Sequence, residues 1–157
     1  MSHISIIQLE KKPVKKENYM KESYLYEDEI LNVKTDYFTD NLSEEDKDIR
    51  LRYLRETLDP IVTIDTKKKT FHFKRRPSIM KAFRTDMEKE IENFKNDLLS
   101  DRCSMRRMRL ALDEPFGDDT LYYYDGYCHT AGMLVDDLLN GWLPKILHIG
   151  EIFDGHN

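Results

Sequence analysis

The chain has 157 residues, of which 39% are hydrophobic and 35% charged, with a net charge of −5 and two cysteines. Its length suits one domain with its own core, and its aromatic residues exclude a disordered chain. Two cysteines without C-x-x-C spacing exclude a disulfide scaffold, and no apolar window approaches the ~20 residues that span a bilayer. We therefore expect a single cytoplasmic domain over residues 1–157, without contact to a membrane.

The N-terminal part of the chain predicts short strands separated by polar segments. Ile4–Leu9 and Tyr24–Tyr26 are strand candidates, whereas Val33–Phe38 fits either a strand or irregular chain. A proline and four lysines over Lys11–Lys16 indicate an exposed loop or sheet edge. We expect residues 1–20, like the C-terminal tail, to be partly loose.

Ser43 marks the start of the first clear helix. It is a candidate N-cap, and the acidic residues that follow it suit the positive end of a helix dipole. Leu51, Leu54 and Leu58 recur at helical spacing and predict one apolar side. Asp59-Pro60 then ends the helix.

The segment Pro60–Leu99 predicts a β-hairpin that leads directly into an amphipathic helix. The arms of the hairpin are Ile61–Asp65 and Lys69–Lys74, and Ser78 is a candidate N-cap for a helix that runs to Leu99. One apolar stripe follows this helix at steps of three or four residues: Met80, Phe83, Met87, Ile91, Phe94 and Leu98. We expect the stripe to pack beside the sheet.

Residues 100–112 fit a helix or a strand equally well, because the run is too short for its periodicity to decide. We expect a helical start followed by a strand. Leu121–Tyr124 predicts a further strand, and Asp125-Gly126 a tight turn after it.

The last part of the chain predicts a helix and a final strand. Thr130 can cap the helix, and Gly141 ends it. Lys145–Phe153 is the strand candidate, with Leu147 and Ile149 on one side. Together the elements predict an α+β fold, a mostly antiparallel sheet packed on one side by two or three helices, the longest about Ser78–Leu99.

Charge is segregated along the sequence, with −5 over residues 1–48, +8 over 49–112 and −8 over 113–157. The acidic segment 113–157 interleaves aromatic residues with nine acids, a composition typical of a surface that binds a basic protein. Its acids could instead pair with the basic residues of segment 49–112 within the same fold. We expect a small interaction or regulatory protein without catalysis or cofactor. The expected partner-binding residues are Asp118, Asp119, Tyr122, Tyr124, Asp136 and Trp142.

The basic middle supports a second hypothesis, a protein that binds nucleic acid through phosphate contacts. Its cations lie on the predicted hairpin and in the arginine cluster Arg102–Arg109. The residues of this alternative are Lys67, Lys68, Lys69, Lys74, Arg75, Arg76, Arg106 and Arg107. Lysines at a hairpin tip also serve solubility, and the chain as a whole is acidic.

A third hypothesis is an enzyme that uses Cys128, because the adjacent His129 could lower the pKa of its thiol. Adjacent residues on a strand point to opposite faces, which argues against this pair, and no glycine-rich phosphate loop or other enzyme signature is present. A possible set of metal ligands comprises Asp136, Asp137, His148, Asp154 and His156. Their spacing matches no zinc motif, so we expect no metal site.

Overall fold

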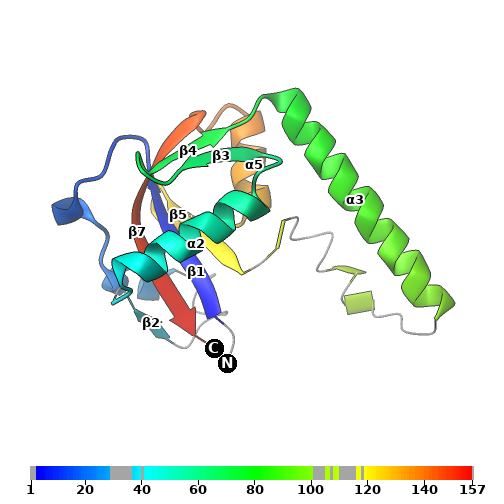
Figure 1. Ribbon diagram of the computed structural model, residues 1–157, viewed down its shortest axis with the longest axis horizontal. Coiled ribbons are helices and arrows are strands. Elements are labelled where there is room, and N and C mark those ends of the chain that lie inside the picture. The colour runs from blue at the N-terminus through cyan, green and yellow to red at the C-terminus, as the bar shows by residue number, and fades with distance from the viewer. Residues whose placement is uncertain are drawn as a thin grey trace.

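The computed structural model describes residues 3–28, 37–39, 41–100, 105–106, 108–109, 116–117 and 119–156. Within these ranges the chain forms helices and a seven-stranded, mostly antiparallel sheet, which confirms the expected α+β fold (Figure 1). The strands lie in the order β3-β4-β7-β1-β5-β6, and β2 pairs with β7 beside this path. Strands β1 and β5 are parallel, whereas the other pairs are antiparallel.

The long last strand is the spine of the sheet. The strands are β1 (His3–Glu10), β2 (Tyr37–Thr39), β3 (Val62–Asp65), β4 (Thr70–Phe73), β5 (Thr120–Tyr124), β6 (Tyr127–His129) and β7 (Ile146–His156). Strand β7 pairs with β1 along one edge and with both β4 and β2 along the other. The predicted strand Ile4–Leu9 is confirmed as part of β1, whereas the expectation of a loose C-terminal tail is wrong for residues 154–156, because they are hydrogen-bonded inside the sheet.

The helices confirm two of the three predicted caps. They are α2 (Glu44–Thr57), α3 (Arg76–Leu99) and α5 (Ala131–Leu139), with short 3-10 helices η1 (Lys16–Asn18) and η2 (Glu22–Glu27). Ser43 caps α2 and Thr130 caps α5, each accepting a backbone N–H three residues on. Ser78 is not an N-cap, because α3 begins at Arg76 and places Pro77 in its first turn, where no N–H is needed.

Each face of the sheet carries its own hydrophobic cluster. The larger cluster joins the sheet to α2 and α5, with Leu51 and Leu54 from α2 and Leu134 and Val135 from α5. The smaller one lies on the opposite face, where Leu25 of η2 is completely buried. Helices cover one face, as expected, and a short 3-10 helix adds cover to the other.

The long helix α3 does not cover the sheet. Figure 1 shows it projecting away from the strands. Ile79, in its first turn, is completely buried, whereas Met87 and Ile91 of the predicted stripe are each about half exposed. The expectation that this stripe packs beside the sheet holds only at its start, where Phe83 is partly buried against the larger cluster, because α2 and α5 cover the rest of the apolar face.

One further assignment differs from the sequence-based one. Tyr24–Tyr26 belongs to the 3-10 helix η2 rather than to a strand, because local backbone hydrogen bonds such as Asp28 N–H to Leu25 C=O satisfy the chain. The interpretation of residues 100–112 lies mostly outside the described residues, as does that of 33–36. No helix in the described ranges is both long enough and apolar enough to span a membrane.

Candidate functional site at the lysine end of the sheet

Two lysine-rich segments that are far apart in the sequence meet at one end of the sheet. His148 of β7 pairs with Glu10 of β1 on one side and with Thr70 of β4 on the other. The loop after β1 and the turn before β4 therefore lie about two strand spacings, roughly 10 Å, apart (Figure 1). We call their six lysines the lysine end: Lys11, Lys12, Lys15, Lys67, Lys68 and Lys69.

The β3–β4 turn is held by a carboxylate that points into it. Asp65 accepts the backbone N–H groups of Lys67 at 3.0 Å and Lys68 at 2.9 Å. The hydrogen bond from Lys68 is the main reason why the pKa of Asp65 is lowered. Lys69 has a left-handed backbone, and its ammonium lies 5.9 Å from the ring centre of Tyr19 in the opposite loop. This contact joins the two lysine-bearing segments.

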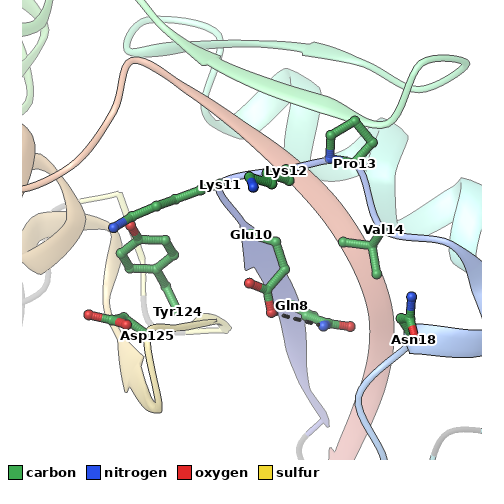
Figure 2. A pocket seen from close by; sticks show the side chains of 9 residues that line it. All are labelled: Gln8, Glu10, Lys11, Lys12, Pro13, Val14, Asn18, Tyr124 and Asp125. Carbon is green, nitrogen blue, oxygen red and sulfur yellow. Dashed lines mark hydrogen bonds between the residues drawn. The ribbon is translucent and has the colours of Figure 1, made fainter.

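A pocket of about 400 Å³ opens between the loop after β1 and the β5–β6 turn (Figure 2). Its lining comes from three segments: Gln8, Glu10, Lys11, Lys12, Pro13, Val14, Asn18, Tyr124 and Asp125. Tyr124 is only 6% exposed, and its hydroxyl has no hydrogen-bond partner among the described residues. Figure 2 shows Lys11 extending toward Tyr124. A buried hydroxyl without a partner is unusual in a protein.

Gln8 fixes the loop that forms the pocket wall. Its side-chain oxygen accepts the N–H of Met20 at 3.0 Å and that of Glu151 at 2.9 Å, while its amide nitrogen donates to Glu10 at 3.1 Å. The side chain lies directly over Gly150, where any Cβ would come within 2.3 Å of the Gln8 oxygen. The loop from Lys11 to Met20 is thus tied to β7 by one buried amide.

The pocket combines donors for an anion with acceptors for hydroxyl or amino groups. Lys11 and Lys12 can donate, whereas the carboxylates of Glu10 and Asp125 can only accept when ionised. A ligand with a phosphate and a sugar or base fits this pattern better than a simple anion does.

The other cations of the nucleic-acid hypothesis do not join the lysine end. Lys74, Arg75 and Arg76 lie at the far end of β4, where they line a second pocket of about 270 Å³ with Lys145. Arg106 is exposed on a short helical stretch, and Arg107 lies outside the described residues.

The predicted acidic face is only partly exposed. Tyr122 and Tyr124 are buried in the core, so neither offers side-chain area to a partner protein. Burial raises the pKa of Tyr122 far above its ordinary value. Asp136 is exposed on α5 and Trp142, just beyond that helix, is 73% exposed, whereas Asp118 lies outside the described residues.

Asp119 stands apart from α5 and has a partner in the fold. Its carboxylate accepts the hydroxyl of Tyr53 on α2 at 3.0 Å. This hydrogen bond, with the negative charge of Asp119, raises the pKa of Tyr53. Those residues of the expected acidic surface that the structure describes therefore belong to separate parts of the molecule.

Cys128 and His129 point to opposite faces of β6, as strand geometry predicts. Cys128 belongs to the smaller core cluster, and its backbone N–H donates to Asp28 at 2.7 Å. Burial, with the nearby charge of Asp28, raises the pKa of the Cys128 thiol well above its ordinary value. His129 lies on the α5 side, 3.4 Å from Asp137. This arrangement does not activate the thiol.

The residues considered as metal ligands separate into three places. Asp136 and Asp137 lie on α5, and His148 lies at the lysine end of β7. Asp154 and His156 do come together at the opposite end of β7, 3.0 Å apart. The sequence analysis missed their neighbour His3, and it also missed Lys11 and Lys12 as parts of a site, because both sets form only through the pairing of β1 with β7.

Comparison with known proteins adds no relationship: no protein-family model, no curated protein and no solved structure matches this chain.

Proposed function

We propose that this protein binds single-stranded nucleic acid, with the lysine end as the phosphate-binding surface. The observation that carries the proposal is the meeting of two lysine segments beside a pocket that Lys11 and Lys12 line. Six lysines spread over two loops exceed what one small anion requires, and they suit a ligand with several phosphates.

The lysines outnumber the carboxylates at this end of the sheet. Against the six lysines stand three carboxylates that lie in the turn or line the pocket, Asp65, Glu10 and Asp125. The side chains of Lys67 and Lys68 are exposed. The surface is therefore locally basic although the chain carries a net charge of −5.

Single strands are favoured over duplexes because the surface has an aromatic ring and a pocket as well as cations. Tyr19 stands beside Lys69, and the pocket offers hydrogen-bonding groups of both kinds. Proteins that bind single strands combine such cations with aromatic rings on which bases stack. In a duplex the bases are stacked inside the helix, so a duplex would contact only the lysines, through its phosphates.

The test is fluorescence anisotropy with labelled oligonucleotides of about 12 residues, DNA and RNA, single- and double-stranded, between 50 and 200 mM salt. The variant Lys67→Gln/Lys68→Gln/Lys69→Gln removes three phosphate contacts. It should reduce the salt slope for single strands by about 2, since each contact contributes roughly 0.7. The matched control Lys81→Gln/Lys89→Gln/Lys95→Gln changes the net charge equally on α3 and should leave the slope unchanged.

A second variant tests the pocket itself. Lys11→Gln/Lys12→Gln removes two exposed cations from the pocket wall, so the free energy of unfolding should change little. The salt slope for the single strand should fall by about 1.4, since each phosphate contact contributes roughly 0.7. Absence of binding at 50 mM salt, or equal losses in the turn variant and the α3 control, would refute the proposal.

A second candidate function is binding of a basic protein segment at the surface formed by α5 and Trp142. The favouring observation is the large exposure of Trp142 near the exposed Asp136. Trp142 is the sole tryptophan, so its fluorescence reports on this surface alone. Titration with a lysine- and arginine-rich peptide should shift the emission, and Asp136→Lys should weaken the effect; an unchanged spectrum at low salt would dismiss this function.

A further inference from the structure

Two histidines and an aspartate converge at the end of the sheet opposite the lysine end. His3 of β1 lies directly across from His156 of β7, and Ser5 lies across from Asp154. One carboxylate oxygen of Asp154 is 3.0 Å from Nδ1 of His3 and 3.0 Å from Nε2 of His156. The three possible ligand atoms all lie within 4.8 Å of one another.

The surrounding side chains hold this cluster in one orientation. Arg50 of α2 contacts the other carboxylate oxygen of Asp154 at 3.0 Å and also donates to the hydroxyl of Ser5. The ring of Tyr37 stacks on His156 with the centres 4.5 Å apart and the planes within 8°. Nδ1 of His156 is buried and has no hydrogen-bond partner in the described structure, so Nε2 is the nitrogen available to a ligand.

We propose that His3, Asp154 and His156 bind a divalent transition-metal ion of the zinc type. A tetrahedral zinc ion about 2.0–2.1 Å from each ligand places neighbouring ligand atoms roughly 3.3 Å apart. Both separations from Asp154, 3.0 Å, approach this value. The two imidazole nitrogens lie within 4.8 Å of each other, and rotation of the half-exposed His3 ring brings them to the distance that the ion requires. The ion replaces the protons that otherwise bridge the imidazoles and the carboxylate.

The chemistry of the donors selects the class of metal. Arg50 neutralises Asp154, so the site has no excess negative charge to attract calcium or magnesium, which require several oxygen ligands. Two imidazole nitrogens and one carboxylate oxygen instead suit zinc and its neighbours in the first transition row. The side chain of His3 is 53% exposed, which leaves one side of the site open for water or another ligand.

Binding is measured by titrating the protein with Zn²⁺ in competition with a chromophoric chelator, and with Co²⁺ by its visible absorption. Zn²⁺ and Co²⁺ should bind at one site, whereas Mg²⁺ should not compete. His3→Ala should weaken Zn²⁺ binding by at least about 100-fold, because even second-layer changes cost 10- to 100-fold. Because the His3 ring is half exposed, this variant should fold like the wild type, and its circular dichroism spectrum should be unchanged.

The exposed His72 on β4 supplies the matched control. His72→Ala should leave the Zn²⁺ affinity and the cobalt spectrum unchanged. Wild-type protein that does not bind Zn²⁺, or equal Zn²⁺ affinity in His3→Ala and wild type, would overturn the proposal and show that the cluster is held by hydrogen bonds alone.

Discussion

Replacing Gly150 by alanine should destabilise the protein through a single side chain, Gln8. The added Cβ would lie 2.3 Å from the Gln8 oxygen, 2.6 Å from its Cδ and 3.0 Å from its Cγ. Gly150 does not have a left-handed backbone, so alanine itself is conformationally allowed there. The cost is therefore steric, and it depends on whether Gln8 can move.

Gln8 cannot move without breaking hydrogen bonds. Gln8 is 4% exposed, and its side-chain oxygen is the acceptor for the N–H groups of Met20 and Glu151. Each N–H left without an acceptor costs about 1–3 kcal/mol. The reduced freedom of the unfolded chain returns only about 0.4–1 kcal/mol. We expect Gly150→Ala to lower the free energy of unfolding by about 2–5 kcal/mol.

A double-mutant cycle measured by urea unfolding separates the clash from other effects. Gln8→Ala alone removes the same acceptor and should cost a similar amount. In the Gln8→Ala background the alanine at position 150 no longer clashes with the Gln8 side chain, so Gly150→Ala should lower the free energy of unfolding by no more than about 0.5 kcal/mol further. If Gly150→Ala costs the same with and without Gln8, or less than about 0.5 kcal/mol in the wild type, the reasoning is refuted.

Three further predictions concern parts of the fold outside both proposed sites. Cys128 should resist alkylation at pH 8 in native protein and react once urea exposes it, because burial raises the pKa of its thiol; rapid native labelling, located by peptide mass spectrometry, would contradict this. Ile79→Ala should cost about 2–4 kcal/mol in urea unfolding, because Ile79 is completely buried at the base of α3, while the control Ile91→Ala on the exposed stripe should stay within about 0.5 kcal/mol; equal costs would contradict the packing described. Thr130→Ala should remove the cap of α5 and cost about 1 kcal/mol by the same assay, and Thr130→Ser should restore most of it; no loss on Thr130→Ala would contradict the capping role.

Local signals in the sequence were enough to find most elements. The caps at Ser43 and Thr130 were predictable because a short polar side chain satisfies the first N–H groups of a helix wherever the helix lies. The β3–β4 hairpin was predictable because its alternation and its turn lie within one short segment. Lys67–Lys69 were therefore identified as a candidate site from the sequence.

Signals that depend on distant partners were misread. The apolar stripe of α3 predicts burial, but the sequence does not state which surface is free to receive it, and α2 and α5 already cover that face of the sheet. Tyr122 and Tyr124 read as surface aromatics among acids, yet their strand lies inside the sheet. Amino-acid composition does not show which helices cover the sheet or which strands flank β5.

The cluster of His3, Asp154 and His156 depends on a register shift in β7 that strand alternation cannot predict. Leu147 and Ile149 share one face of β7, and strict alternation would place Phe153 on that face too. The register against β1 shifts by one residue between Ile7 and Leu9, so Ile152 takes the place beside Ile149 and Phe153 points to the opposite cluster.

The same shift turns Asp154 and His156 toward α2, where Arg50 reaches the aspartate. Gln8 closes this irregularity by accepting the N–H of Glu151. The histidine cluster at one end of β7 and the loop wall at the other thus both depend on the register shift near Gly150. For this reason Gly150→Ala should perturb both ends of the strand, which a substitution in either site alone should not do.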